Sequence, residues 1–376
     1  MKKFIFIITL IILAFSLLSV SCPSPQPNGE IASEVTEYDP QALLDLPGFG
    51  VGVNIGNTLD SIGTNSWLAG ETGWGNPRIT KNLVVALKGH GYKTIRLPVT
   101  WAENIGPAPN YAIAQSWMDR VEEVVNWILE EDLYCILNLH HDGGTSDKSW
   151  ILDMATKENE TLDKYTKVWN QIALRFKNAP VNLILESMNE VGFDRQSSTE
   201  AYRKLNLLNQ TFVDVVRASG GNNATRQLLI AGYWTDIEKT CNPLFKMPKD
   251  TVDDRLIVSV HYYTPSTFCI ADNPDNSWGF RADWGTDFDR LQLTSLFNKL
   301  KTNFLDKGVP VVLGEYGVTK RNKDEESRVK WMAAVTQISI TNGICPVLWD
   351  TGGEISRNSP YKMSDSLKKA MASLVF

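Results

Sequence analysis

Residues 178–194 read NAPVNLILESMNEVGFD, and this stretch decides the fold. Residues 181–185 form a short, mostly apolar run of the kind that a strand buried on both faces requires. Three polar side chains follow almost at once: Glu186, Asn189 and Glu190. A buried strand that ends in carboxylates raises the question of what those carboxylates face, and the other apolar runs of the chain supply the answer.

Seven further apolar runs recur along the chain, at 48–56, 92–101, 133–141, 227–234, 256–263, 310–317 and 344–353. They are nearly continuous in apolar character rather than alternating, which is typical of parallel strands covered on both faces. Helical periodicity lies between several of them, at 117–131, 197–220 and 325–341. Eight strands that alternate with helices predict a (β/α)8 barrel. The alternative, a doubly wound open sheet, would carry a GxGxxG turn after its first strand, and the glycines of 50–57 lack that spacing.

Two parts of the pattern bear on that prediction. Ser197 and Glu200 have the spacing of a capping box at the start of the 197–220 helix, and Gly220 with Gly221 ends it. Residues 235–255 show no clean helical pattern, so the unit between the fifth and sixth strands is the weakest of the eight.

Polar and aromatic side chains collect where each apolar run stops. Because the carboxyl ends of barrel strands meet at one mouth, we expect these side chains to form the active site. They are Asn54, Asn57, Arg96, Asn138, His140, His141, Asn189, Glu190, Trp234, His261, Tyr263, Glu315, Tyr316 and Trp349.

Two of these residues, Glu190 and Glu315, are carboxylates on strands that lie nearly opposite each other. Paired carboxylates suit glycoside hydrolysis, and a retaining enzyme holds them roughly 5–5.5 Å apart. Two like charges at that distance have split pKa values. We expect Glu315, near Arg96, to stay ionised and Glu190 to stay protonated.

A metal site is not expected. His140 and His141 are adjacent, and adjacent strand residues point to opposite faces, so both would not reach one ion. The chain has four histidines and no HExxH motif. We therefore expect no metal and no cofactor.

The twelve tryptophans divide into two groups. Four fall in helical segments and are expected in the core: Trp117, Trp127, Trp169 and Trp331. Eight fall at strand ends or in the loops that follow: Trp67, Trp74, Trp101, Trp150, Trp234, Trp278, Trp284 and Trp349. An indole can hold the apolar face of a sugar ring, so this second group favours a carbohydrate substrate, although some of its members are expected only to pack.

The N-terminus reads as an export signal, with Lys2 and Lys3 before an apolar stretch. We expect a signal peptide at 1–21, a Pro/Ser-rich tether at 22–39 and the catalytic barrel at 40–376. Cys22 lies where lipidation would occur, although Ser19 departs from the usual lipobox. A surface or periplasmic lipoprotein is the first hypothesis, and a secreted enzyme or an uncleaved anchor are alternatives.

The net charge and the remaining cysteines limit which binding partners and disulfides are expected. The net charge of −6 argues against nucleic acid and acidic lipid, so membrane contact would come only through a lipid on Cys22. We expect a monomer. Cys135 and Cys345 lie in apolar runs and are expected to be buried thiols, whereas Cys241 and Cys269 lie in loops and could form a disulfide.

The motifs GVNIGNTLD, ETGWGNP, TIRLPVTW, ILNLHHDGG, LESMNEVG, HYYTP, LGEYG and VLWDTGG together resemble glycoside hydrolase family 5, the cellulase family, and in particular its subfamily 4. The similarity runs from about Leu43 to the C-terminus. It implies a (β/α)8 barrel, retaining hydrolysis of β-1,4-glucans inside the chain, and no cofactor. Xyloglucan-specific hydrolysis is an alternative, β-mannan hydrolysis a weaker one, and a non-catalytic carbohydrate-binding barrel would be expected to lack one of the two glutamates.

The resemblance also implies residue roles. Glu190 matches the acid/base and Glu315 the nucleophile, while Asn189 matches the residue that holds the sugar 2-hydroxyl. Arg96 and Tyr263 match groups that contact the nucleophile. Further substrate-binding positions are expected at Asn54, His140, His141, Trp234, His261 and Trp349. Val191 stands where the commonest form of the motif has proline, which we expect to be harmless.

Overall fold

The computed structural model describes residues 49–63, 70–144 and 146–375. Eight parallel strands close into a barrel in chain order, so the predicted (β/α)8 architecture is confirmed. The strands are β1 (Gly52–Asn54), β2 (Thr94–Leu97), β3 (Tyr134–Asn138), β4 (Leu183–Glu186), β5 (Leu228–Asp236), β6 (Leu256–Tyr262), β7 (Val311–Tyr316) and β8 (Cys345–Leu348). Each lies inside or overlaps one of the eight apolar runs.

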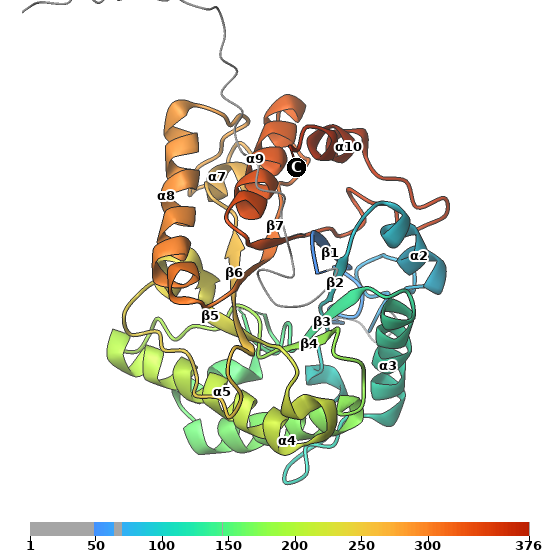
Figure 1. The fold of residues 1–376 in the computed structure, drawn as a ribbon, viewed down its shortest axis with the longest axis vertical. Helices are drawn as coiled ribbons and strands as arrows, with labels where there is room; N and C mark the ends of the chain where they lie inside the picture. Colours follow the sequence, from blue (N-terminus) through green and yellow to red (C-terminus); the bar gives the residue numbers. More distant parts are fainter. Residues whose placement is uncertain (1–48, 64–69, 145, 376) are drawn as a thin grey trace, which may run out of the picture. The chain divides into compact units, whose positions relative to one another are not determined.

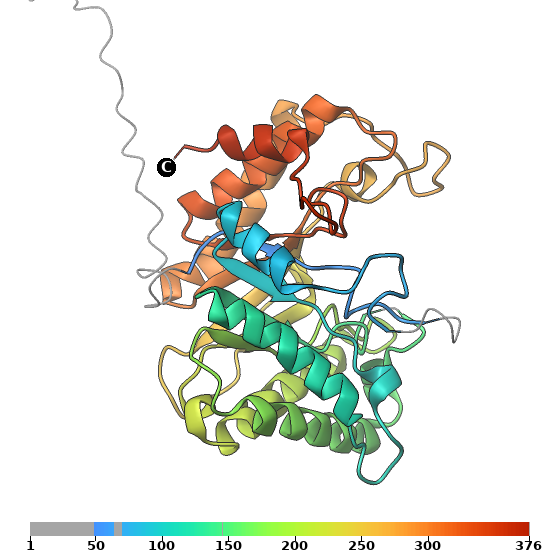
Figure 2. The ribbon, with the colours of Figure 1, turned by 90° about the vertical axis from the view of Figure 1, so that its right-hand side faces the viewer.

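Helices surround the strands (Figures 1 and 2). They are α2 (Lys81–Gly89), α3 (Gln115–Glu130), α4 (Glu158–Phe176), α5 (Ser198–Ala218), α6 (Ile237–Thr240), α7 (Ser266–Cys269), α8 (Asp287–Asn303), α9 (Glu325–Thr341) and α10 (Asp365–Ala372). The three helices predicted from periodicity are α3, α5 and α9, and the bounds of α9 agree with the sequence pattern. A 3-10 turn, η2 (Trp150–Ala155), precedes α4.

One of the two hydrogen bonds of the predicted capping box is present at the start of α5. The Ser197 side chain accepts the backbone N–H of Glu200, as expected. The Glu200 carboxylate does not return to Ser197 and instead pairs with Arg203 and Lys204 on the next turn. A cation one turn along offers a charge-assisted hydrogen bond, which is stronger than one to a neutral backbone N–H.

The connection between β5 and β6 carries only the four-residue helix α6, as the missing helical pattern at 235–255 indicated. The rest of that segment is irregular. It is tied to α5 by a buried ion pair between Arg217 and Asp250, with 2.7 Å between Nη2 and Oδ2. The barrel is closed although the unit between β5 and β6 lacks a long covering helix.

The core has two layers, because the strands are apolar on both faces. One cluster fills the barrel interior: Phe49, Tyr134, Ile136, Ile184, Leu229, Ile257, Val312, Cys345 and Val347. A second, larger cluster lies between the strands and the helices and includes Trp169 of α4 and Trp331 of α9. The runs are nearly continuous in apolar character because their side chains pack into both clusters.

Cys241 and Cys269 are separate thiols, so the disulfide considered for them does not form. Cys269 is buried in the core, and burial raises its pKa well above the usual value. The predicted signal peptide, the tether and Trp67 lie outside the described residues. Within the part of the chain that is described, no helix has the length and apolar character that crossing a bilayer requires.

Candidate active site

Glu190 and Glu315 meet at the mouth of the barrel. Glu190 follows β4, and Glu315 lies near the end of β7. One carboxylate oxygen from each, together with a ring nitrogen of His261, lie within 4.8 Å of one another. The facing pair expected from the strand ends is present.

Glu315 is a buried carboxylate with donors on both oxygens. Arg96 Nη1 donates to Oε1 at 2.7 Å, and the Tyr263 hydroxyl donates to Oε2 at 2.9 Å. Burial, together with the charges of Glu315 and Glu190, raises the pKa of Tyr263 well above its usual value. Tyr263 therefore keeps its proton and serves as a donor, and the two contacts set the direction of the Glu315 carboxylate.

Glu190 has fewer partners and a strained backbone. Its φ is 45°, in the left-handed region that costs a non-glycine residue free energy. His261 Nδ1 lies 2.8 Å from Oε1, and 39% of the Glu190 side chain is exposed. The neighbouring Val191 is buried, and its carbonyl accepts the backbone N–H of Trp234 at 2.8 Å. The residue that replaces proline therefore belongs to the core that supports Glu190.

The pKa shifts of the two glutamates run opposite to the expectation from the sequence. Burial opposes ionisation of Glu190, but the hydrogen bond with His261 and the charges of His261 and Arg96 outweigh it and lower its pKa. Burial raises the pKa of Glu315 against His261 and Arg96, and the Glu190 charge adds to the rise. Because the two carboxylates lie this close, they titrate as a pair, and these shifts make Glu315 the more basic of the two.

Glu186, which was not among the expected site residues, lies four positions before Glu190 and is fully buried. Arg96 Nε donates to its Oε2 at 2.7 Å, Asn138 Nδ2 to the same oxygen at 3.1 Å, and Ser259 Oγ to Oε1 at 2.7 Å. The available signal was its position inside an apolar strand, because a buried carboxylate there requires a cationic partner.

Arg96 connects this buried group to the rest of the site. Its Nη1 donates to Asn54 Oδ1 at 3.0 Å, and its Nη2 donates to Asn189 Oδ1 at 2.8 Å. With that oxygen occupied, the amide group of Asn189 is left to donate. Asn54 donates to the backbone oxygen of Gly314 at 2.9 Å and is fully buried, so it holds β7 and does not face the cleft as expected.

His140, His141 and Trp349 form one aromatic group. The rings of His140 and Trp349 are stacked with centroids 5.5 Å apart, and those of His140 and His141 are 4.6 Å apart, edge to face. The argument that adjacent residues point to opposite faces was wrong here, because β3 ends at Asn138 and both histidines lie beyond it. Burial lowers the pKa of His141 to about 4, and burial with nearby cations lowers that of His140 well below its usual value.

Two sets of described residues have metal-ligand atoms within 4.8 Å of one another, and both lie at this mouth. One is Asp60, His140 and His141, and the other contains the two catalytic candidates with His261. The Asp60 oxygens already accept the backbone N–H groups of Asn57 and Thr58, and burial raises its pKa to about 6. The carboxylates of the second set accept hydrogen bonds as described, whereas His141 Nε2 in the first set and His261 Nε2 in the second are buried without a hydrogen-bond partner.

The indole ring of Trp234 lies beside Glu190 and is held in position by its neighbours. Its φ of 53° places it in a bulge of β5, and its Nε1 donates to Asp194 Oδ1 at 3.0 Å. A Cβ on Gly192 would lie 2.1 Å from that Nε1, so only glycine admits the indole there.

The tryptophans at strand ends and in loops differ in how far they are buried. Trp101 and Trp284 are buried and pack rather than face the cleft, whereas Trp74 and Trp278 are exposed. Trp74 lies edge-on against His141 with 5.3 Å between centroids. The expected sugar-facing set is therefore smaller than the eight loop positions, which is the outcome expected for some of them.

Comparisons with known proteins agree with this geometry. Residues 55–354 match the model of the cellulase family, glycosyl hydrolase family 5. Endoglucanase A of Paenibacillus barcinonensis is 38% identical over 81% of this chain and 80% of its own length. Some curated relatives are longer, and the chain spans 66% of one and 61% of another.

Two solved structures are similar over nearly their whole length. A GH5-4 broad specificity endoglucanase from an uncultured bovine rumen ciliate has a TM-score of 0.78 and 35% identity, covering 89% of this chain and 98% of its own. A family 5 xyloglucanase from Paenibacillus pabuli has a TM-score of 0.78 and 34% identity, covering 86% and 98%. The chain belongs to glycosyl hydrolase family 5, the cellulase family. Within that family it is a glycoside hydrolase of the endoglucanase type.

Proposed function

We propose that this endo-β-1,4-glucanase cleaves its substrate with retention of configuration, using Glu190 as acid/base and Glu315 as nucleophile. The observation that carries the proposal is the separation of the two carboxylates, whose oxygens lie within 4.8 Å. Retaining enzymes hold their carboxyl groups roughly 5–5.5 Å apart and inverting enzymes roughly 6.5–9.5 Å, to leave room for a water.

The partners of each carboxylate support the division of roles. Glu315, directed by Arg96 and Tyr263, would attack the anomeric carbon and form a glycosyl-enzyme. Glu190 would give its proton to the glycosidic oxygen and later take one from water. A bound glycosidic oxygen is an acceptor, which favours the protonated form of Glu190, so substrate binding would raise the pKa of Glu190.

The stereochemical test is proton NMR on a fresh digest. Retention requires that the first product carries the β anomer, and mutarotation then adds the α anomer. An initial α signal would contradict the proposal. Azide added to Glu190→Ala should yield a β-glycosyl azide, because the small anion replaces water without needing a general base.

We also propose soluble β-1,4-glucans, xyloglucan among them, as substrates and β-mannan as a poor one. Arg96 occupies Asn189 Oδ1 and leaves its amide to bond an equatorial 2-hydroxyl. The axial 2-hydroxyl of mannan would leave that donor misplaced, at a cost of about 1–3 kcal/mol. Rates on carboxymethylcellulose, xyloglucan, lichenan and mannan test the order, and viscosity should fall before reducing ends accumulate. Equal rates on mannan would contradict it.

Export is a separate part of the proposal and rests on the sequence of residues 1–39. If Cys22 carries a lipid, the full-length protein enters the detergent phase, and Cys22→Ser moves it to the aqueous phase. Identical partitioning of the two proteins would end the lipoprotein hypothesis, and cleavage without lipid would favour the secreted form.

A further inference from the structure

The side-chain amide of Asn138 has a fixed orientation. Asn138 is the last residue of β3 and is fully buried. Its Oδ1 accepts the backbone N–H of Val99 at 3.2 Å, and its Nδ2 donates to Glu186 Oε2 at 3.1 Å. Glu186 is ion-paired with Arg96, so its carboxylate only accepts, and a backbone N–H only donates. Exchanging the oxygen and nitrogen of the amide would therefore break both contacts.

The second hydrogen of the same amide nitrogen fixes the tautomer of His140. His140 Nδ1 lies 3.2 Å from Asn138 Nδ2. Because an amide nitrogen donates and does not accept, Nδ1 is the acceptor of this contact and carries no proton. Burial, together with the charges of His141 and Arg96, lowers the pKa of His140 well below its usual value, which keeps the ring neutral. A neutral imidazole has one ring proton, so in His140 that proton is on Nε2.

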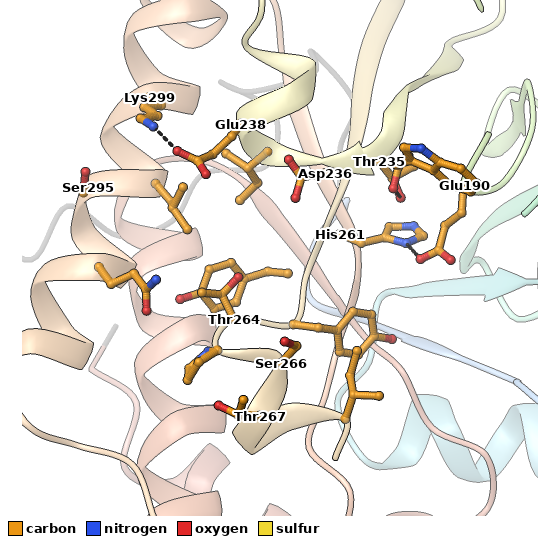
Figure 3. Close-up of a pocket in the computed structure, with 18 of the residues that line it drawn as sticks. Glu190, Thr235, Asp236, Glu238, His261, Thr264, Ser266, Thr267, Ser295 and Lys299 are labelled. Carbon is orange, nitrogen blue, oxygen red and sulfur yellow. Dashed lines mark hydrogen bonds and ion pairs between the residues drawn. The ribbon is translucent and has the colours of Figure 1, made fainter. Parts of the chain in front are cut away.

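His261, the other buried histidine beside the glutamates, has the opposite arrangement. Its Nδ1 lies 2.8 Å from Glu190 Oε1, as Figure 3 shows. Burial of Glu190 is outweighed by the contact with His261 and by nearby cations, which lower the pKa of Glu190, so its carboxylate accepts and Nδ1 of His261 donates. The two histidines thus differ in the ring nitrogen that carries a proton, because one faces a donor amide and the other an acceptor carboxylate.

The ring plane of His140 is fixed as well as its tautomer. The imidazole is stacked on the indole of Trp349, with an angle of 6° between the planes. In the part of the chain that the structure describes, Nε2 of His140 has no hydrogen-bond partner, so its N–H is left to donate to a ligand. A sugar hydroxyl can donate or accept, and the tautomer of the imidazole decides which of the two its oxygen does.

We infer that Asn138 is a positioning residue that sets the tautomer of His140, so that the ring presents an N–H donor at Nε2 to a hydroxyl oxygen of the glucan. The inference rests on the proposed function, because that function places a glucan at the barrel mouth. Asn138 was expected at the active site from its position at a strand end. Its role is indirect, since it is fully buried and both hydrogens of its amide are occupied.

The direct test is NMR on the substrate-free wild-type protein labelled with ¹⁵N-histidine. The chain has four histidines, so the spectrum has few signals, and His140→Gln identifies the His140 signals by their loss. Correlations between the ring carbon-bound protons and the ring nitrogens distinguish a protonated from an unprotonated nitrogen. We expect a proton on Nε2 and none on Nδ1. A proton on Nδ1, alone or in a doubly protonated ring, would overturn the inference.

Asn138→Asp is the variant that should reverse the tautomer. It keeps the shape and an acceptor for Val99, but the second oxygen has no hydrogen for His140 Nδ1. We expect the ring proton to move to Nδ1, and kcat/KM on carboxymethylcellulose to fall about tenfold, the effect of one lost hydrogen bond. If the new charge beside Glu186 prevents folding, Asn138→Ala replaces this variant, and the proton should then be divided between the two nitrogens. A proton that stays wholly on Nε2 without the amide would contradict the inference.

Ser259→Ala is the matched control. It removes another donor of Glu186 and so loosens the same buried layer, but it does not touch His140. Its His140 proton should stay on Nε2. If the proton moved in this variant too, loosening of the layer and not the Asn138 amide would determine the tautomer. The His261 signals provide an internal reference, which the Asn138 variants should leave unchanged.

Failure of the proposed function would be seen separately, because the NMR measurement needs no substrate. If Glu190→Ala kept wild-type activity, the acid/base assignment would fall, whatever the tautomer of His140. If Glu190→Ala is inactive as expected but the wild-type His140 carries its proton on Nδ1, only the inference about Asn138 falls.

Discussion

Two layers of polar groups lie at the carboxyl ends of the strands, and they differ in how fully they are hydrogen-bonded. The buried polar layer consists of Arg96, Asn138, Glu186 and Ser259, all fully buried. Both oxygens of Glu186 have donors there. The reactive layer consists of Glu190, His261, Tyr263 and Glu315. In it Glu190 has one partner, and His261 Nε2 is buried without a partner.

The comparison teaches where reactivity lies. Glu186 accepts three hydrogen bonds from fully buried donors, so it is held inside the barrel. Glu190 lies only four positions later, just after β4, yet it has one partner and a partly exposed side chain. Glu315 also has donors on both oxygens, but it lies at the mouth beside Glu190, where Arg96 of the buried polar layer contacts it.

The largest expected effect is on kcat, and it distinguishes the reactive layer from the buried polar layer. Glu190→Ala and Glu315→Ala should each lower kcat by about 10³-fold or more, as removal of an essential catalytic group does. The free energy of unfolding of Glu190→Ala should change little compared with the wild type, since the Glu190 side chain is partly exposed and has one partner. Measured kcat on carboxymethylcellulose near the wild-type value for either variant would show that the reactive layer is misassigned.

The second effect breaks the lower layer while the reactive layer stays chemically intact. Glu186→Gln removes the charge that faces Arg96 and leaves a neutral amide of similar shape. We expect kcat to fall by about 10- to 100-fold, because a small displacement of Arg96 misplaces Glu315. KM should change less than kcat. Glu186→Asp, which restores the charge, should recover part of the activity, and a failure to do so would argue for a purely structural role.

The third effect tests a single bond of the lower layer. Ser259→Ala leaves Glu186 Oε1 without its donor. The free energy of unfolding should fall by about 1–3 kcal/mol, the cost of an unsatisfied buried group. Urea unfolding measures this. Thr302→Ala on the exposed face of α8 is the control, since its hydroxyl bonds only within the helix. Equal stability of the two variants would mean that Glu186 finds another partner.

The smallest effect is a shift between two pH profiles. The proposed role of Glu190 as the acid requires its protonated form, so activity should decline as pH rises through the pKa of Glu190. In the free enzyme His261 lowers this pKa, and a bound glycosidic oxygen should raise it. The basic limb of kcat should therefore lie at higher pH than the basic limb of kcat/KM. Coincident limbs would mean that substrate binding does not raise the pKa of Glu190.

Much of the fold could be predicted because its signals are local. Eight apolar runs and their polar ends are visible in single segments such as 181–190, and the parallel barrel follows from their number and character. The four-residue α6 was visible as a missing pattern at 235–255. The facing glutamates could be predicted for the same reason, since strand ends converge in any closed parallel barrel.

The partners of these groups depended on the tertiary structure. Arg96 and Glu186 are 90 positions apart, and no local pattern relates them, so only the packed barrel shows that Glu186 belongs to the site. Burial of Asn54, Trp101 and Trp284 likewise depends on which loops cover them.

The sequence by itself thus determined the family, the barrel and the two carboxylates, because the residue types at strand ends carry that information. Only the tertiary structure decided which carboxylates are buried, which side chains they contact and in which direction their pKa values shift. These properties depend on distance and desolvation between segments remote in the chain, and hydrogen bonds and pKa values respond to such distances rather than to sequence neighbours.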